Sequence, residues 1–330
     1  MTGANETMRA LVQEGYGSAD VLRIREIARP AVSEGCVLVK VRAASVNALD
    51  WHTVHGGLAI RAVASLMRQR NEPVRGVDLA GVVEAVGPNV TRFAPGDAVF
   101  GGAPAAFAEY ARAREESLVL KPQGLSFEQA AAIGVAGRTA LQGLRDIAQV
   151  KPGQRVLICG AGGGVGTFAV QIAKALGAHV AAVTSSRNLD LVRALGPDEL
   201  IDYTQGDFTR RAARYDVIFD IAAHRSLSDL RRVLAPGGTL VMAGAAKRGG
   251  IVGIFARIGG ALVRSRLLHQ RVVFFVAKPS VDDLVVLKEL IEAGKICPAI
   301  DRTYPLSEAA AAVAYVGSGQ ARAKVVIAVS

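Results

Sequence analysis

A glycine-rich turn between an apolar strand and a helix constrains this sequence most. The segment 156–166 reads VLICGAGGGVG, and TFAVQIAKALG follows it directly. Glycines let a backbone approach phosphate oxygens closely, and the helix that follows offers unpaired N–H groups and the positive end of its dipole. The spacing departs from the standard G-x-G-x-x-G, because Ala161 takes the first fingerprint position. A tight turn without a ligand is the alternative, but the strand–turn–helix order favours a dinucleotide site.

The residues after the next strand indicate which dinucleotide binds. An NAD site usually places Asp or Glu about 20 residues beyond the turn, on the ribose 2′-hydroxyl. This chain has Ser185 and Arg187 in that region, and the first acid is Asp190. A carboxylate would repel a 2′-phosphate, whereas serine and arginine can donate hydrogen bonds to it. We therefore predict NADPH as the cofactor, with a merely solvated Arg187 as the alternative.

The pattern of the chain changes near residue 125. Segments 37–46 and 76–87 read as strands. One Ala-rich helix is predicted over 126–144, opened by Ser126 as its cap. From residue 150 onward, strands and helices alternate, which predicts a parallel sheet with helices on both faces. A capped amphipathic helix over 280–294 and then a last helix and strand complete the chain.

Composition excludes several classes of protein. Of the 330 residues 51% are hydrophobic and 21% charged, which argues against a disordered or fibrous chain. Only 5% are aromatic, so a platform for stacking nucleic-acid bases is not expected. The net charge of +10 is concentrated, because residues 247–278 contain seven Lys and Arg and no acid. We therefore expect no specific nucleic-acid partner.

The cysteines and the apolar segments predict a cytoplasmic protein. Cys36, Cys159 and Cys297 lie too far apart in sequence for a disulfide framework or a CxxC metal knuckle. The first residues carry no apolar leader, and the longest apolar stretch is broken by glycines and Lys174. These features favour a reducing compartment.

Several motifs occur in one order over nearly the whole chain. They include VLVKVRAASVNALD, RGVDLAGVVEAVG, AAIGVAGRTALQGL, GAGGGVGTFAVQIAKALGA and LAPGGTLVMAGA. With them the chain resembles the medium-chain dehydrogenase/reductase superfamily and, within it, the zinc-free quinone oxidoreductases of the zeta-crystallin type. The resemblance implies an α/β protein with a GroES-like β-rich catalytic domain (1–125 and 299–330). It also implies a Rossmann doubly wound parallel-sheet domain that binds NADP (126–298), and a homodimer.

The same resemblance predicts that metal is absent. Zinc alcohol dehydrogenases carry Gly-His-Glu where this chain has Gly76-Val77-Asp78, and their first catalytic cysteine lies near Ser45 to Asn47. Without a thiolate and an imidazole, a tetrahedral zinc site has no ligands. Quinones and α,β-unsaturated carbonyls need less polarisation than simple ketones, because conjugation spreads the charge of an incoming hydride. We therefore expect hydride transfer from NADPH to a quinone or enone without zinc.

Candidate catalytic residues fall in the segment SVNALDWHTVHG. Asn47 could donate to the substrate carbonyl or to the nicotinamide ribose, and Asp50 could orient a neighbour. His52, three residues before His55, could supply a proton after hydride transfer. The alternative is that both histidines only line a cleft or face solvent. Trp51 is either a wall of the substrate site or a packing residue.

The resemblance assigns cofactor contacts mostly to the second half of the chain. Thr139 matches a threonine on the nicotinamide side, and Tyr203 matches a tyrosine at the adenosine end, near the 2′-phosphate. The neighbouring Arg138 faces either solvent or the cofactor. The predicted cofactor-binding residues are Thr139, Gly162, Gly163, Gly164, Val165, Ser185, Arg187, Tyr203, Gly244, Phe275, Val276 and Lys324.

The basic segment 246–270 lies outside the best-matching motifs. Its apolar residues recur at helical spacing with arginines beside them. A lid or subunit contact is favoured over peripheral contact with an anionic membrane surface. The predicted function is NADPH-dependent reduction of a quinone or enone. The alternatives are an alkenal or enoyl reductase of the same fold, and a low-turnover NADPH-binding redox sensor or nucleic-acid-binding protein.

Overall fold

The computed structural model describes residues 6–56, 74–243 and 270–330. The chain divides into two compact units. Unit 1 comprises Met1–Ala136, Pro279–Glu292 and Pro298–Ser330, and unit 2 comprises Gly137–Lys278 and Ala293–Cys297. Among the described residues no helix is both long and apolar enough to cross a membrane.

Unit 1 is built on a seven-stranded sheet. The strands run in the order β14-β15-β3-β4-β5-β7, and β6 pairs with β3. A separate antiparallel pair is formed by β1 and β2. The strand bounds are β1 (Thr7–Gln13), β2 (Leu22–Ala28), β3 (Cys36–Val46), β4 (Asp78–Val86), β5 (Ala98–Gly102), β6 (Tyr110–Arg114), β7 (Leu118–Leu120), β14 (Ile300–Pro305) and β15 (Lys324–Ala328).

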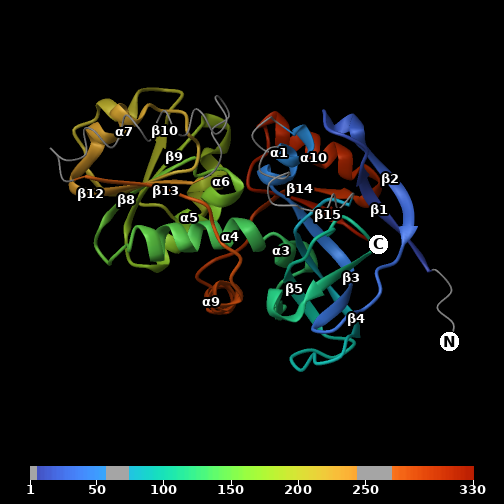
Figure 1. Cartoon of the computed structure of the whole chain (residues 1–330). Helices are drawn as coiled ribbons and strands as arrows, with labels where there is room; N and C mark the ends of the chain where they lie inside the picture. The colour runs from blue at the N-terminus through green and yellow to red at the C-terminus, as the bar shows by residue number, and fades with distance from the viewer. Residues whose placement is uncertain (1–5, 57–73, 244–269) are drawn as a thin grey trace. The chain divides into compact units, whose positions relative to one another are not determined.

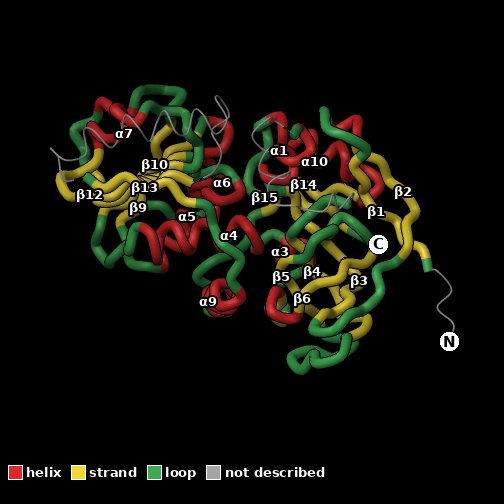
Figure 2. Tube along the Cα trace, viewed as in Figure 1, coloured by secondary structure: helices red, strands yellow, loops and turns green. Residues whose placement is uncertain are grey.

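The last strand completes the sheet that the first strands begin. Val325 of β15 lies opposite Val46 of β3 in antiparallel register, and β3 pairs with β4 on its other side. The helices described in this unit are α1 (Ala48–His55), α3 (Phe127–Ala131), α9 (Val281–Glu292) and α10 (Ala309–Ser318). Helices α1 and α10 pack side by side, as Figure 2 shows. The side chains between the sheet and helices α1 and α10 form one apolar core.

Unit 2 is a parallel six-stranded sheet in the order β10-β9-β8-β11-β12-β13. Helices α5 and α7 lie on opposite faces of it (Figure 1). The central strands are buried on both faces, as parallel strands between helices require. The elements are β8 (Arg155–Cys159), α5 (Gly164–Ala175), β9 (His179–Thr184), α6 (Leu189–Ala194), β10 (Glu199–Asp202), β11 (Tyr215–Asp220), α7 (Leu227–Val233), β12 (Leu234–Ala243) and β13 (Arg271–Phe275).

The predicted fold class is confirmed, whereas the helix predicted over 126–144 is wrong as a single element. The segment instead forms α3, then α4 (Gly134–Leu141), then a π-helical stretch, η3 (Gln142–Ile147). A Cβ on Gly134 would come within 2.0 Å of Asp78 Oδ1, so the chain passes that carboxylate where only glycine fits. The second helix therefore starts beside Asp78.

The contact-defined units differ from the predicted domain ranges in two places. The first unit extends to Ala136 rather than 125, because α3 packs against β3, β4, β5 and β15. It also includes α9, which packs on β7. An amphipathic helix does not reveal in its sequence which unit covers its apolar face.

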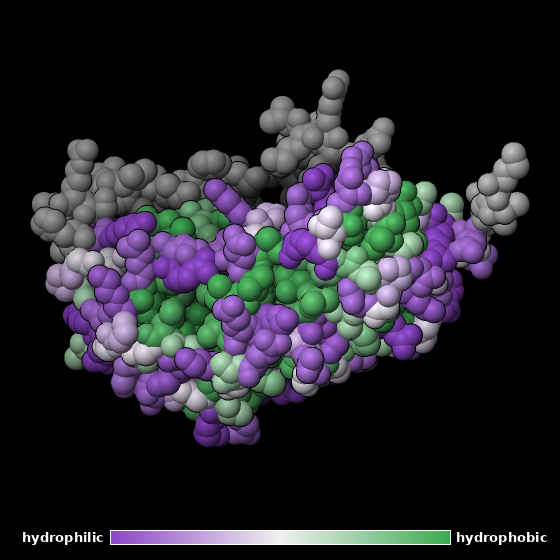
Figure 3. Space-filling model, turned by 90° about the horizontal axis from the view of Figure 1, so that it is seen from below, coloured by the Kyte–Doolittle hydropathy of each residue, from purple (hydrophilic) through white to green (hydrophobic). Residues whose placement is uncertain are grey.

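The surface carries polar residues between patches of apolar ones, as the face in Figure 3 shows. Among the large apolar residues that are exposed, Val276 has 73% of its surface accessible and Leu49 has 56%. Val276 is a predicted cofactor-binding residue, and Leu49 precedes the predicted Asp50.

Candidate functional site

A buried polar network in unit 1 brings together three of the predicted residues. Asn47 caps α1 at its N-terminus, and its backbone N–H donates to Asp50 Oδ2 at 2.7 Å. The Lys324 ammonium, which is 3% exposed, donates to Asn47 Oδ1 at 2.6 Å and to the Val46 carbonyl at 3.3 Å. These contacts join the end of β3, the start of α1 and the start of β15.

Asp78 is the acceptor at the centre of this network. Its Oδ2 accepts from Asn47 Nδ2 at 2.9 Å and from Ser45 Oγ at 3.3 Å. The backbone N–H of Val135, at the start of α4, donates to both carboxylate oxygens at 3.0 Å. Sequence reasoning considered Asp78 only as part of a missing zinc motif. The signal for its role is an acid inside the otherwise apolar strand segment VDLAGVV.

The network limits what Asn47 can do. Its Nδ2 donates to Asp78 at 2.9 Å and to the Ser45 carbonyl at 3.4 Å, and its Oδ1 is occupied by Lys324. An amide has two N–H donors, so both are engaged inside unit 1. Asn47 therefore fixes the α1 corner, and its amide would have to exchange a partner before it could bind a substrate.

Burial shifts the ionisation of the network in opposite directions. Desolvation, with a smaller contribution from the Asp78 charge, raises the pKa of Asp50 from 3.8 to about 7, although the Asn47 N–H opposes the shift. Desolvation lowers the pKa of Lys324, and the charges of Asp78 and Asp50 oppose that shift. Asp50 is thus a buried carboxyl that exchanges a proton near neutral pH.

His52 and Trp51 are neighbours on α1. Trp51 packs on α10, where a Cβ on Gly317 would come within 2.3 Å of the indole, and its ring stacks on His55 at 5.2 Å. The structure thus favours packing for Trp51. His52 lies half-buried on α1 in the same unit.

The glycine-rich turn in unit 2 has the geometry of a phosphate cradle. Gly160 adopts a left-handed φ of +89°, and its N–H and that of Ala161 donate to the Val183 carbonyl of β9 at 3.2 and 3.0 Å. A Cβ on Gly166 would come within 2.1 Å of the Gly160 carbonyl, so helix and turn touch backbone to backbone. Gly163 caps α5, and a Cβ there would meet nothing nearer than 3.5 Å.

This cradle fits the pyrophosphate of a dinucleotide. Gly163, where an added Cβ would make only an ordinary van der Waals contact, is the N-cap of the 12-residue helix α5. The first N–H groups of a helix have no acceptor within the helix, so those of Gly164 and Val165 are available to an anion. A nicotinamide cofactor held there would supply the hydride. The turn is fastened by its packing against Asn188, which lies 2.6 Å from a Cβ placed on Gly162.

The residues predicted at the adenosine end gather at the carboxyl ends of β9 and β10. Ser185 is half-buried and Arg187 exposed, both directly after β9. Tyr203 follows β10, and its N–H donates to the Thr184 carbonyl at 3.0 Å. Sequence reasoning missed Asp202, whose carboxylate accepts from Ser186 Oγ at 2.5 Å. Hydrogen bonds from Ser186 and Thr204 hold the pKa of Asp202 below its ordinary value.

The other predicted cofactor residues belong to other elements of the chain or lie outside the described residues. Thr139 is half-buried in α4. Phe275 packs on Phe219 with ring centroids 6.4 Å apart, and the Val276 side chain after it is exposed. Lys324 belongs to the buried network of unit 1. Gly244 and the predicted segment 246–270, apart from Gln270, lie outside the described residues.

Comparisons with known proteins agree with both units. Residues 33–123 match the alcohol dehydrogenase GroES-like domain, and residues 195–327 match the zinc-binding dehydrogenase family. A chloroplastic quinone-oxidoreductase of Triphysaria versicolor is 32% identical, covering 98% of this chain and 99% of that protein. An NADPH-dependent alkenal/one oxidoreductase of Arabidopsis thaliana is 33% identical, covering 97% of this chain and 79% of that protein.

A solved structure shows the same fold over almost the whole length. The quinone oxidoreductase of Coxiella burnetii superposes with a TM-score of 0.85 at 30% identity, covering 98% of this chain and all of the other. The chain therefore belongs to the medium-chain dehydrogenase/reductase superfamily and, within it, to the quinone oxidoreductase family. It is an oxidoreductase that uses a nicotinamide cofactor.

The buried Asp50 carboxyl predicts how stability depends on pH. Between pH 3.8 and about 7 the folded chain holds a proton that the unfolded chain has lost. This contribution to stability is complete below pH 3.8 and is lost as the pH rises through about 7, with a slope of up to about 1.4 kcal/mol per pH unit. Thermal unfolding from pH 5 to 8 should show a flatter dependence for Asp50→Asn than for the wild type. The exposed Asp190→Asn variant is the control and should keep the wild-type slope.

The close contact between Gly166 and the Gly160 carbonyl can be tested by substitution. In Gly166→Ala, the new methyl would meet the Gly160 carbonyl, so the turn must shift. We expect a loss of roughly 1–3 kcal/mol in the free energy of unfolding, together with at least tenfold weaker cofactor binding. Urea unfolding and NADPH fluorescence titration measure the two effects. Gly206→Ala, where a Cβ meets nothing within 4 Å, is the matched control. Wild-type values for Gly166→Ala would contradict the tight contact.

Proposed function

We propose that this protein transfers a hydride from NADPH to a quinone or an α,β-unsaturated carbonyl without zinc. The observation that carries the proposal is the glycine cradle at the N-terminus of α5, followed after β9 by Ser185 and Arg187 in place of an acid. The names of the relatives, quinone oxidoreductase and alkenal/one oxidoreductase, support the acceptor class.

The donor set of unit 1 supports chemistry without a metal. Val77, at the position of a zinc-binding histidine, has no ligand atom, and Asp78 is engaged by Asn47, Ser45 and Val135. Within residues 6–56, 74–243 and 270–330, no three His, Cys, Asp or Glu side chains are grouped closely enough to hold a metal ion. A conjugated acceptor suits such a site because it delocalises the charge that zinc would otherwise stabilise.

The positive charge after the carboxyl end of β9 favours NADPH over NADH. Arg187 would pair with the 2′-phosphate, and Ser185 would donate to it. Asp202 lies near these two residues, but its carboxylate already accepts hydrogen bonds from Ser186 and Thr204. We propose NADPH over NADH on this basis, with the protein acting as a homodimer.

The deciding measurement is NADPH oxidation against a panel of quinones, alkenals, enoyl thioesters and simple ketones. We expect turnover with the conjugated acceptors and none with the ketones. The turnover rates will show which of the conjugated classes the enzyme reduces fastest. Dialysis against a zinc chelator should leave the rate unchanged. A rate that falls on chelation and returns with zinc would contradict the metal-free proposal, and the absence of oxidation with every acceptor would contradict the reductase proposal.

Arg187→Ala tests the cofactor preference. Losing a charge-assisted hydrogen bond to the 2′-phosphate should weaken NADPH binding roughly ten- to hundredfold and leave NADH binding nearly unchanged. Fluorescence titration gives both dissociation constants. Arg193→Ala, which removes an exposed arginine paired with Asp190 on α6, is the control. Equal losses for the two cofactors would mean that Arg187 does not bind the 2′-phosphate.

A further inference from the structure

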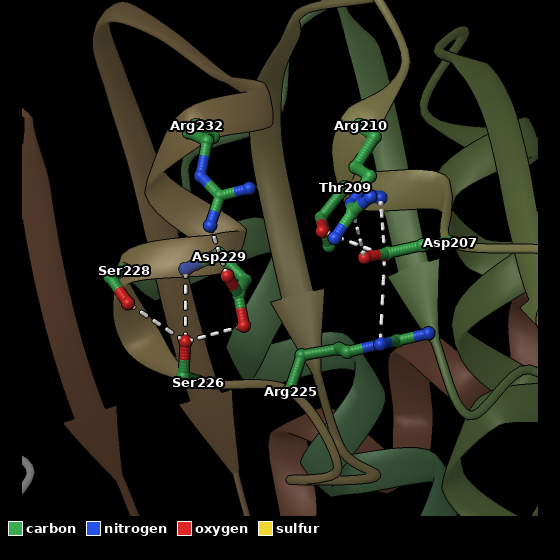
Figure 4. Close-up of polar contacts among 8 residues, drawn as sticks. All are labelled: Asp207, Thr209, Arg210, Arg225, Ser226, Ser228, Asp229 and Arg232. Carbon is green, nitrogen blue, oxygen red and sulfur yellow. Dashed lines mark hydrogen bonds and ion pairs between the residues drawn. The ribbon is translucent and has the colours of Figure 1, made fainter.

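Two glutamines of unit 2 are bonded differently from the charged side chains at its surface. In Figure 4, the Asp207 carboxylate pairs with Arg210 at 3.5 Å and with Arg225 at 3.6 Å. Gln142 and Gln171 are instead buried, with 9% and 8% of their surface exposed. Each of them bonds to both backbone groups of one residue far along the chain. A buried amide of this kind fixes the backbone it bonds to, because no water replaces either partner.

Gln142 holds the backbone of Lys278. Its Nε2 donates to the Lys278 carbonyl at 2.8 Å, and the Lys278 N–H donates to its Oε1 at 3.0 Å. Lys278 lies three residues beyond β13 and precedes Pro279. A residue before proline is biased toward extended backbone, which presents its N–H and its carbonyl on the same side, as a strand does. Gln142 thus takes the place of a neighbouring strand for Lys278.

The stretch that carries Gln142 also contacts β13 itself. β13 is the last strand of the described sheet, with a strand partner, β12, on one side only. A Cβ on Gly143 would come within 2.7 Å of the Phe219 ring and 3.2 Å of the Phe275 ring. At the start of β13, the Arg271 guanidinium donates to the Ile147 carbonyl at 2.9 Å. The π-helical η3 therefore holds this strand from its first residue to its last, and such stretches often lie at functional sites.

The segment after β13 lies on the side of the sheet toward which the nicotinamide half of a cofactor would extend. All six strands are parallel, so their carboxyl ends share one edge. The glycine turn follows β8, and Ser185 and Arg187, proposed for the 2′-phosphate, follow the neighbouring β9. The pyrophosphate lies between the two halves of a dinucleotide, so the nicotinamide half would extend past β11 and β12 toward β13. There the side chain of Val276 is exposed.

We infer that Gln142 is a positioning residue for hydride transfer, which holds segment 276–278 as a support for the nicotinamide ring. The inference rests on the proposed function and adds to it a residue that acts through the Lys278 backbone. Reacting atoms must lie about 3–3.5 Å apart, and a misplacement of about 1 Å can cost a hundredfold in rate. A loosened support would therefore slow hydride transfer while the adenosine end stays bound.

Gln142→Met tests the inference, because methionine fills a similar volume and makes neither hydrogen bond. With saturating NADPH and a quinone that the wild type reduces, kcat should fall about tenfold or more. Affinity for adenosine 2′,5′-bisphosphate, which lacks the nicotinamide, should stay within about twofold of the wild type. Steady-state kinetics and titration calorimetry measure the two quantities.

Gln142→Glu is the conservative variant, and it carries the test if Gln142→Met does not fold. Its carboxyl keeps an acceptor for the Lys278 N–H, but it can donate to the Lys278 carbonyl only when it is protonated. Its kcat, taken relative to the wild type at each pH, should therefore be higher at pH 6 than at pH 8. A ratio that does not change with pH would contradict the role of this bond.

Gln171→Met is the matched control, because Gln171 makes the same pair of bonds from α5. Its Nε2 donates to the Cys297 carbonyl at 3.1 Å, and the Cys297 N–H donates to its Oε1 at 2.8 Å, again just before a proline. We expect both Met variants to lose thermal stability, but only Gln142→Met to lose kcat. Equal losses of kcat in the two, or a wild-type kcat in Gln142→Met, would overturn the inference. A wild-type protein that oxidises no NADPH with any acceptor would overturn the proposed function itself.

Discussion

The buried carboxylate of Asp78 is the constraint on which unit 1 depends. It sits at the first position of β4 and accepts hydrogen bonds from β3, from the corner before α1 and from the first turn of α4. A buried carboxylate that loses its donors costs several kcal/mol, so these elements are held to one arrangement. The same demand explains Gly134, because any side chain there would collide with the carboxylate.

The network also shows how a buried site can exchange protons near neutral pH. Asp50 and Lys324 share Asn47 as a partner, one through its backbone N–H and the other through its side-chain oxygen. Burial disfavours charge on both groups, which raises the pKa of the carboxyl and lowers that of the amine. In unit 2 the equivalent constraint is steric. There the contact of Gly166 with the Gly160 carbonyl brings the first turn of α5 against the glycine turn.

Much of the fold could be predicted from local patterns. The alternation of strands and helices from residue 150 onward gave the parallel sheet, because buried parallel strands are short continuous apolar runs. The helix predicted directly after the glycine-rich turn is α5, Gly164–Ala175. The break between α3 and α4 could not be predicted, because its cause is a carboxylate 57 residues before Val135 in the chain. Likewise, nothing local in the sequence shows that Lys324 bonds to Asn47.

The sequence by itself determined the glycine cradle, the missing metal ligands at Val77 and the basic residue after β9, since each depends on residue type at a fixed spacing. Only the tertiary structure decided which polar groups share partners. It engaged both amide hydrogens of Asn47, placed Trp51 on α10 and brought His224 to Tyr203 from a strand three positions away in the sheet. Hydrogen bonds and ring contacts join atoms that are close in space but can be far apart in sequence. They can form only after strand pairing and loop conformation have brought those atoms together.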